Sequence, residues 1–342
     1  MNIKNQIQLS EWMRNLELPK DFRIMGIELG GSKIQAICLS SEGKFLIHRR
    51  ALAKAEHGAA GIRETLLQLI REIEKSAGTF SLIGVGFGGL VDWRSGTTKA
   101  SFQVRGWEDF PLAEWISNQC GGAEVVVEND TNSAAFAESM IGSGFNHSHV
   151  LYSNSGSGVG AGYVVHREIF RGSSFFEMEL GHLRVGEYLQ PLQNLCSGWS
   201  IDERIRQHIE AEPESEFSQL LLSQRPSHGF WGKVFDDSVS QNNPDAIRIL
   251  NEVARVYALG LSHATYLLGP SVIVLGGGVS LMGEVWCSTI SNHLDDFVQA
   301  PFSTSIPQIK LSALGELVVP LGAALLAIKR HQKTISQSVI CN

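Results

Sequence analysis

The sequence contains few cysteines, and they are not grouped. The five cysteines, Cys38, Cys120, Cys196, Cys287 and Cys341, lie far apart, and neither a C-x-C nor a C-x-x-C pair occurs. Disulfide frameworks and cysteine-rich zinc sites both depend on such grouping. We therefore expect neither feature, and the cysteine usage fits a reducing, cytoplasmic environment.

Long apolar runs and excess positive charge are also missing. No run of about 18 uncharged apolar residues occurs, so we expect no membrane span. Residues 1–20 contain no apolar segment of the kind found in secretory signals. With 28 Lys and Arg against 35 Asp and Glu, the formal net charge is −7. Binding to a nucleic-acid backbone needs a basic face, so we expect no nucleic-acid partner either.

The length of 342 residues is large for a single core and predicts two lobes. Short apolar runs predict strands, and apolar residues at helical spacing predict helices. In the first half we predict strands at 23–29, 33–40, 44–52, 81–87 and 123–129, helices at 59–78, 111–120 and 131–142, and a loop with two tryptophans before residue 111.

The second half of the chain opens in the same style. We predict strands at 149–155, 163–170 and 308–314, a strand followed by a glycine turn within 271–279, and a turn at 156–162. After an irregular stretch at 176–200 we predict that the chain becomes helical, with helices at 245–269 and 320–331. Both halves open with a strand, a glycine-rich turn and a strand, and this order predicts a duplicated α/β design. Two such turns that face each other across a cleft could hold one polyphosphate between them.

Glycine clusters are the most prominent local feature. "GVGFGG" (84–89) and "GSGVGA" (156–161) match the dinucleotide-binding pattern, but neither is followed by a convincing helix, so we reject that interpretation. No P-loop pattern occurs. A plain tight turn would explain any single cluster. Several clusters at strand ends, including "GIELGGSKI" (26–34), favour contact with phosphate and nucleotide.

The segment "VVVENDTNSAAF" places Asn129 and Asp130 between an apolar strand and a helix. Asn and Asp are good N-caps, so a purely structural role is one interpretation. Residues at the carboxyl ends of strands in α/β sheets also line ligand crevices. In that second interpretation Asp130 takes a proton from a substrate hydroxyl that attacks phosphorus, and Asn129 binds a polyol.

The segment "EMELGHLRV" (177–185) places Glu179 and His182 three residues apart. An ordinary charged surface loop is one interpretation. The functional interpretation is a polar clamp on neighbouring hydroxyls of a substrate. A single Glu-x-x-His is also half of a metal site, but no matching second pair lies nearby, which disfavours a metal.

Taken together, these segments resemble the ROK family of repressors and sugar kinases over about residues 23–332. "GIELGGSK" resembles the first phosphate motif of that family, "GSGVGAG" the second, and "VIVLGGGV" the turn beside adenosine. "GFGGLVD" is similar to the loop after the fourth strand. "ENDTNSAAFAE" is similar to the catalytic Asn-Asp segment, and "ELGH" to the Glu-x-Gly-His motif. All six occur in the family order.

The resemblance implies an α/β fold of the actin-like, hexokinase-like (ribonuclease H-like) class, duplicated into two lobes with a central cleft. It implies an N-terminal extension at 1–22, a first lobe at 23–145 plus 320–335, and a second lobe at 146–319. It further implies that Asp130 is the general base of an ATP-dependent sugar kinase. A dimer is the usual assembly of such proteins.

The resemblance also implies a set of ligand contacts. Those to the sugar would come from Asn129, Glu179, His182, Gln103, Gln193 and Gly89. Those to ATP would come from Gly30, Gly31, Ser32, Lys33, Gly156, Ser157, Gly158, Gly276, Gly277 and Gly278. Mg²⁺ would accompany ATP and bridge its phosphates. Glu28 would meet this ion directly or through water.

The sequence departs from the family pattern at several positions. Glu28 stands where Asp is usual, Gln103 where a sugar-contacting Asn is usual, and Met178 where Gly is usual. The zinc knuckle that normally follows the His of the motif is replaced by "HLRVGEYLQPLQNLCSGWSI", with Gln193 in place of a sugar-binding Glu. Cys196 lies outside the usual ligand positions, so we expect no zinc.

Three functional hypotheses follow. The first is an ATP-dependent, glucokinase-like kinase of a hexose or hexose-like polyol, and the two amide side chains, Gln103 and Gln193, would favour a modified sugar, an amino sugar or a cyclitol. The second is a non-catalytic sugar sensor or repressor. About 22 residues precede the first strand, too few for a winged helix, which disfavours it. The third is a degenerate kinase kept as a scaffold.

Overall fold

The computed structural model describes residues 3–16, 18–186, 189–224 and 230–340. The chain folds into two compact units, which consist of Met1–Tyr152, Gly162–Glu177 and Ser312–Asn342, and of Ser153–Ala161 and Met178–Leu311. Each unit therefore combines segments that are distant in the sequence. The lobe boundaries expected from the sequence stay a prediction, because compact units and family lobes are defined by different criteria.

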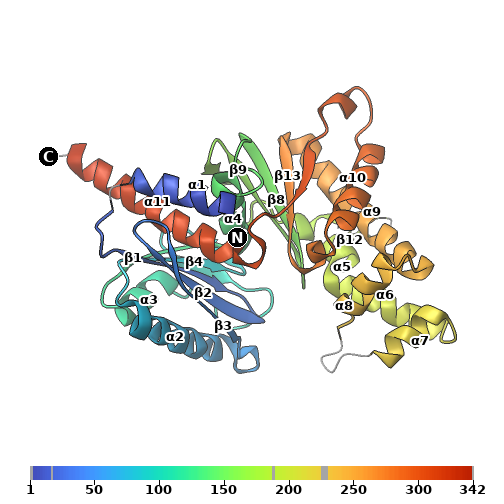
Figure 1. The fold of residues 1–342 in the computed structure, drawn as a ribbon, viewed down its shortest axis with the longest axis horizontal. Coiled ribbons are helices and arrows are strands. Elements are labelled where there is room, and N and C mark those ends of the chain that lie inside the picture. Colours follow the sequence, from blue (N-terminus) through green and yellow to red (C-terminus); the bar gives the residue numbers. More distant parts are fainter. Residues whose placement is uncertain (1–2, 17, 187–188, 225–229, 341–342) are drawn as a thin grey trace. The chain divides into compact units, whose positions relative to one another are not determined.

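The first unit is built on a five-stranded sheet with the strand order β3-β2-β1-β4-β7 (Figure 1). β1 pairs antiparallel with β2 and parallel with β4, and β4 pairs parallel with β7. The ends of the parallel strands are aligned, so that Leu29 pairs with Phe87 and Phe87 with Asn129. The strands are β1 (Arg23–Leu29), β2 (Lys33–Ser40), β3 (Phe45–Leu52), β4 (Leu82–Phe87) and β7 (Glu124–Asn129), and all five predictions are confirmed to within one residue.

Helices cover both faces of this sheet (Figure 1). On one face, α2 (Gly58–Ala77) and α3 (Leu112–Gln119) bury their apolar side chains against alternate residues of β1, β2 and β4, with Trp107 in the same core. On the other face, α11 (Val318–Ile340) packs on β1 and β4 and against α4 (Asp130–Ile141). The helices predicted in the first half are confirmed, and the last predicted helix is longer than expected.

Glycines on the α11 face explain why this helix lies so close to the sheet. Gly26 and Gly84 pair with each other on β1 and β4. A Cβ on Gly26 would overlap the Pro320 carbonyl oxygen, and a Cβ on Gly84 would overlap that of Ala323. The first glycines of "GVGFGG" therefore serve helix packing, which agrees with rejecting the dinucleotide-binding interpretation.

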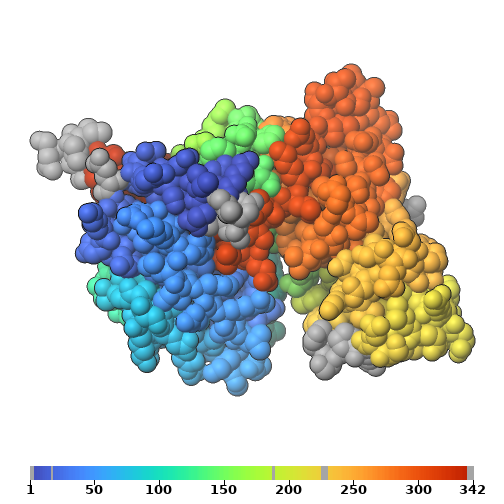
Figure 2. Space-filling model, viewed as in Figure 1, coloured from blue at the N-terminus to red at the C-terminus, as the bar shows by residue number. Residues whose placement is uncertain are grey.

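The predicted N-terminal extension contains a helix, α1 (Ile3–Arg14), that the sequence analysis did not predict. Residues 1–2 and 17 of the extension lie outside the described residues. Leu9 and Met13 are buried, and Gln6 Nε2 donates to the Gly43 carbonyl over 2.8 Å. The helix, dark blue in Figure 2, lies on the surface of the first unit. It is thus part of that unit's packing.

Three predictions around the loop regions are corrected. The loop before residue 111 contains a hairpin, β5 (Leu90–Asp92) with β6 (Thr97–Ala100). The predicted turn at 156–162 is too long, because β9 (Val159–Val165) starts inside it. The predicted strand 163–170 is wrong as a single strand. It breaks at His166 and Arg167, whose φ angles of 48° and 63° form a two-residue hairpin turn before β10 (Glu168–Ile169).

The predicted irregular stretch at 176–200 also contains regular structure, although residues 187–188 lie outside the described part. Its elements are short: η2 (Leu180–His182), β11 (Arg184–Val185), β12 (Gln190–Pro191) and α5 (Gln193–Cys196), followed by the start of α6 (Gly198–Ala211). None of them is long enough to show helical or strand periodicity in the sequence, which is why the analysis missed them.

The second sheet has the order β10-β9-β8-β13-β14. Its remaining strands are β8 (His149–Ser155), β13 (Val272–Gly276) and β14 (Gln308–Leu311), and β13 and β14 are parallel. The strand and the glycine turn predicted within 271–279 are both confirmed, whereas β14 ends earlier than the predicted strand 308–314. At Gly277 the φ of 84° turns the chain out of β13 and into η3 (Gly278–Met282).

Helices of the second unit pack around α9 (Pro244–Leu268), which Asn243 caps at its start and the left-handed Gly269 ends. Tyr257 of α9 stacks on Trp286 of α10 (Glu284–Phe297) at 5.7 Å between ring centroids, and its hydroxyl donates to Ser153 over 2.6 Å.

The other described elements are α7 (Glu216–Ser223), α8 (Gly232–Ser240), η1 (Ala55–His57), η4 (Phe302–Ser305) and η5 (Gly315–Leu317). None of the described helices is long and apolar enough to span a membrane.

The packing of α11 leads to a stability prediction. We expect Gly84→Ala to lower the free energy of unfolding by about 2–3 kcal/mol, because the added methyl group forces α11 away from the sheet. Gly232→Ala is the control, since no atom of the described residues lies within 4 Å of a Cβ there, and we expect a change within about 0.5 kcal/mol. Urea unfolding of both variants measures this, and equal stabilities would contradict the packing argument.

Candidate functional site

The Asn129–Asp130 turn lies where β7 ends and α4 begins. Asn129 is the N-cap of α4, and its Oδ1 accepts from the backbone N–H groups of Thr131 at 2.9 Å and Asn132 at 3.0 Å. Its Nδ2 donates to the Gly89 carbonyl over 3.2 Å. The interpretation of Asn129 as an N-cap is therefore confirmed. With Oδ1 used for capping, Nδ2 is the group that Asn129 can offer to a ligand.

Asp130 is the first residue of α4. Its Oδ1 accepts from the Thr131 N–H at 2.8 Å, and its Oδ2 lies 3.6 Å from the position that a Cβ on Gly88 would take. The N-terminal end of a helix favours negative charge. The helix end and the Thr131 N–H both favour the ionised carboxylate of Asp130, and Gly88 leaves room beside it.

The turn between β1 and β2 holds Gly30, Gly31, Ser32 and Lys33. It is closed by a hydrogen bond from the Gly30 N–H to the Lys33 carbonyl at 3.1 Å. The ammonium of Lys33 lies 3.6 Å from Glu28 Oε1 and 3.6 Å from Glu316 Oε1. The residue predicted to contact phosphate therefore makes ion pairs within the first unit.

Glu28 lies just before this turn and is largely buried. Gln35, opposite it on β2, donates to its carboxylate and also to the Glu316 carbonyl. Burial raises the pKa of Glu28, and the nearby charge of Lys33 opposes that rise. Gln35 is not among the predicted site residues, although a polar residue inside the apolar run "KIQAICL" is a visible signal.

Gln103 lies against the same turn. A Cβ on Gly31 would come within 2.6 Å of Gln103 Oε1 and 3.4 Å of its Cβ. A cavity of about 10 Å³ lies alongside, lined by Leu29, Gly30, Gly31, Ile62, Phe87, Gly88, Ser101, Val104 and Trp107. That volume holds one water at most. The loop that carries Gln103 is thus closely packed on the β1–β2 turn.

In the second unit, two predicted nucleotide turns touch each other. The turn of Gly156, Ser157 and Gly158 follows β8, and Gly277 follows β13. A Cβ on Gly277 would overlap the Ser155 carbonyl oxygen, and one on Gly156 would lie 4.0 Å from the Gly278 nitrogen. The approach at Gly277, where φ is 84°, requires glycine, whereas the contact at Gly156 is an ordinary one. The Gly156 N–H donates to the Gly158 carbonyl at 2.9 Å and closes its own turn.

Gln193 lies between the second turn and the Glu179–His182 segment. Its Oε1 would be 3.0 Å from a Cβ on Gly158, and its Cβ would be 3.3 Å from one on Gly181. Within the segment, His182 Nε2 lies 3.8 Å from Glu179 Oε2. The predicted residues thus form two groups. The first unit holds Glu28, Gly30, Gly31, Ser32, Lys33, Gly89, Gln103, Asn129 and Asp130, and the second holds Gly156, Ser157, Gly158, Glu179, His182, Gln193, Gly276, Gly277 and Gly278.

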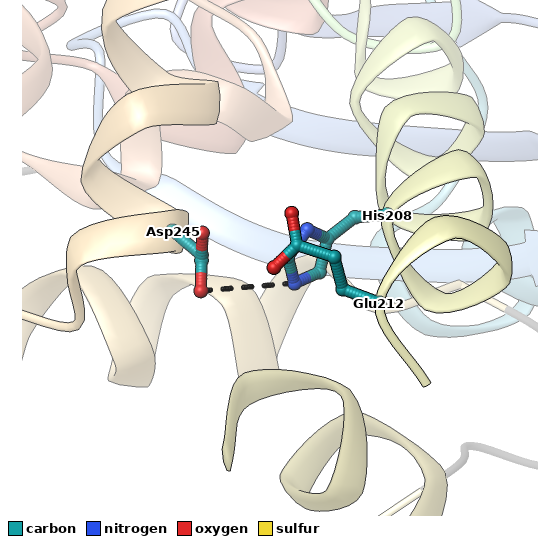
Figure 3. Close-up of side chains that lie close together, drawn as sticks. All are labelled: His208, Glu212 and Asp245. Atoms are coloured by element: carbon teal, nitrogen blue, oxygen red, sulfur yellow. Dashed lines mark ion pairs between the residues drawn. The ribbon is translucent and has the colours of Figure 1, made fainter. Parts of the chain in front are cut away.

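One cluster with metal-ligand chemistry occurs among the described residues: His208, Glu212 and Asp245, in the second unit (Figure 3). His208 Nε2 lies 3.1 Å from Ser215 Oγ and 3.8 Å from Asp245 Oδ2, and its Nδ1 lies 3.3 Å from an Arg248 nitrogen. A guanidinium only donates, so Nδ1 must accept and the proton lies on Nε2. Nε2 is then a donor to its neighbours and is not prepared to bind a metal.

Cys196, which the sequence places near the missing zinc knuckle, is buried in α5. Its thiol donates to the Leu192 carbonyl over 3.2 Å, and burial raises its pKa well above the usual value. A cysteine binds zinc as its thiolate. The local environment of Cys196 therefore opposes metal binding.

We accordingly expect purified protein to contain far less than one zinc per chain, measured by mass spectrometry of the metals, and the same low content in His208→Ala. The reason is the donor state of His208 and the protonated thiol of Cys196. One zinc per chain in the wild-type protein would contradict this expectation, and its loss in His208→Ala would locate the ion in the cluster of Figure 3.

The chain matches one family model and several known proteins. The ROK family model matches residues 24–330. The glucokinase of Thermotoga maritima is 25% identical over 92% of this chain and 99% of its own length. A putative xylose repressor of Caldicellulosiruptor sp. (strain Rt8B.4) is 26% identical over 77% of this chain and 67% of that protein.

Solved structures agree with these sequence relatives. The crystal structure of a ROK family glucokinase from Streptomyces griseus in complex with glucose and AMPPNP matches with a TM-score of 0.81 and 27% identity, covering 90% of this chain and 99% of that one. The expected family and the expected actin-like, hexokinase-like α/β fold class are both confirmed. This chain is a member of the ROK family.

Proposed function

We propose that this chain transfers the γ-phosphoryl group of ATP to a hydroxyl of a hexose or hexose-like polyol. The observation that carries the proposal is the Asn129–Asp130 turn, which presents a carboxylate at the aligned carboxyl ends of β1, β4 and β7. Glucokinases among the relatives support sugar phosphorylation at the level of the family.

In this proposal Asp130 is the general base. It accepts the proton of the attacking hydroxyl, and Nδ2 of Asn129 donates a hydrogen bond to the same sugar. Asn129 and Asp130 are held by the first turn of α4, so the base does not have to be ordered when the substrate arrives. Glu179, His182, Gln103, Gln193 and Gly89 are the proposed further sugar contacts.

ATP is the proposed phosphoryl donor. The β1–β2 turn and the turns at 156–158 and 276–278 offer glycine backbone to its phosphates and adenosine, and the relative from Streptomyces griseus was crystallised with the ATP analogue AMPPNP. Magnesium would enter with ATP and spread the charge of the phosphates. Glu28 fits a contact through water, because Lys33 and Gln35 already face its carboxylate and Mg²⁺ keeps several of its waters.

The proposed acceptors include sugars other than glucose because of two amide side chains. Gln103 and Gln193 each present a donor and an acceptor where the family usually has Asn and Glu. A site whose polar groups match particular hydroxyls discriminates strongly between sugars. Amino sugars and cyclitols are therefore included with the hexoses.

A second candidate function is a non-catalytic sugar-responsive regulator. The observation that favours it is the similarity to a putative xylose repressor. The discriminating result would be sugar binding by calorimetry without phosphorylation of any sugar in a panel of hexoses, amino sugars and cyclitols, together with a DNA complex in a gel-shift assay.

Asp130→Asn tests the proposed base. We expect kcat with the accepted sugar to fall by at least about 100-fold, because an amide cannot take the proton, while sugar binding persists. Asp109→Asn is the control, since Asp109 is exposed and pairs with Lys99, and its kcat should stay near the wild-type value. Turnover by Asp130→Asn close to that of the wild type would show that the base has been wrongly assigned.

Glu28→Ala tests the acidic residue before the first turn. We expect kcat to fall by about 10- to 100-fold, with a smaller change in the dissociation constant of ATP. The reason is that Glu28, which would contact Mg²⁺ only through water, would orient the ion for the reaction and contribute less to binding. Glu42→Ala is the matched control in the next hairpin, where Glu42 is exposed and pairs with Lys44. Unchanged turnover, measured beside ATP calorimetry, would remove Glu28 from the site.

A further inference from the structure

A buried ion pair adjoins the proposed catalytic turn. Glu128 is the residue before Asn129, and it is only 4% exposed. Arg171 binds its carboxylate with both terminal nitrogens: Nη1 lies 3.1 Å from Oε1, and Nη2 donates to Oε2. Bidentate pairs of this kind fix the orientation of the carboxylate as well as its charge.

The other bonds of Glu128 lead directly to the turn. Its Oε1 accepts from the backbone N–H of Asn129 at 2.9 Å and from Nδ2 of Asn132 at 3.2 Å. Asn129 and Asn132 flank Asp130 on either side along the chain. The carboxylate of Glu128 is therefore a bridge between Arg171 and the residues that hold the proposed base.

Arg171 is itself held in place from its other side. Its guanidinium lies 4.4 Å from the centroid of the Trp93 ring, and Nη1 lies 3.9 Å from Glu177 Oε1. The side chains of Glu128 and Glu177 are 5% and 9% exposed, against 24% for Arg171. The guanidinium of Arg171 thus forms ion pairs with two largely buried carboxylates. All of these residues belong to the first unit.

We propose that Arg171 is a positioning residue for the reaction: through Glu128 it fixes the backbone of Asn129 and the first turn of α4, and so the direction in which Asp130 and Asn129 face the sugar. The inference rests on the proposed function for its effect on turnover. Its structural part, the link from Arg171 to the α4 turn, is independent of that function.

The physical reason is the cost of an unpaired buried charge. Without Arg171, the Glu128 carboxylate has to find water or a proton, and either change alters its bonds to Asn129 and Asn132. A displacement of about 1 Å at the base is enough to reduce turnover by about 100-fold. The glycine turns that are proposed to hold ATP do not depend on this pair, so the KM for ATP should stay nearly unchanged while turnover falls.

The first variants are Arg171→Met, which keeps a long apolar side chain beside Trp93, and the double variant Glu128→Gln with Arg171→Met, which removes both charges. A Gln at position 128 can still accept from Asn129 and Asn132 with one oxygen, so we expect the double variant to recover activity over the single one. Arg330→Met is the matched control, because Arg330 donates to the carbonyls of Trp93 and Arg94 on the surface and does not contact Glu128.

Two measurements separate positioning from simple stability. The first is the set of kcat, KM for sugar and KM for ATP. The second is hydrogen exchange of peptides that span residues 126–136, which reports on the capped amides of the turn without needing catalysis. For Arg171→Met we expect kcat to fall by about 10- to 100-fold, KM for ATP to change by less than about twofold, and exchange in 126–136 to accelerate. Arg330→Met should change none of these.

The outcomes are distinct. A kcat for Arg171→Met within about twofold of the wild type would overturn the inference, and so would a loss of kcat with unchanged exchange in 126–136. If the wild-type protein phosphorylates no sugar while exchange still accelerates, the proposed kinase function fails and the link from Arg171 to the turn stands. Should Arg171→Met not fold, Arg171→Lys keeps the charge but loses the bidentate bonds, and unchanged exchange and kcat in that variant would likewise overturn the proposal.

Discussion

The close contact between the backbone of α11 and the first sheet is the constraint on which the proposed site depends. Gly26 and Gly84 let the helix lie directly on β1 and β4, and Gly322 of α11 in turn approaches the backbone of Ser133 in α4. A Cβ on Gly86 would lie 3.5 Å from the Cα of Asp130. The same packing that fills the core therefore sets how far the first turn of α4 stands from the ends of the strands.

Capping and ligand binding are compatible roles for the Asn129–Asp130 turn. Asn129 uses its oxygen to satisfy N–H groups of α4 and keeps its nitrogen side toward Gly89. A cap of this kind makes the turn rigid, and rigidity is what a base needs to meet a hydroxyl in one orientation. The capping interpretation of the sequence is confirmed, and the ligand-binding interpretation, which stays a proposal, is compatible with the same arrangement.

Several charged groups near the proposed site are already paired within the protein. Lys33 bridges Glu28 and Glu316, and Arg171 binds Glu128 and approaches Glu177. Buried charges need such partners, since an unpaired one is costly. As a result the side chains of Glu28 and Glu316 beside the β1–β2 turn, and those of Glu128 and Glu177 beside Arg171, are held in defined directions.

The apolar periodicity placed the strands 23–29 and 33–40 and the helix 245–269, whose end carries glycine and whose start carries a capping residue. It did not place α6 or α10, although each is long enough to show a period. Spaced motifs were sufficient to identify the family, which the match over residues 24–330 confirms. Short elements such as β5, β11 and α5 escaped prediction, because two to four residues show no period. The helix α1 escaped too, since its Leu9 and Met13 are buried by contact with the β2–β3 turn, which the sequence of the helix does not reveal.

The partners of Glu28, Glu128 and Gln103 come from strands, helices and loops distant in the chain. Long-range packing therefore decided what those side chains touch.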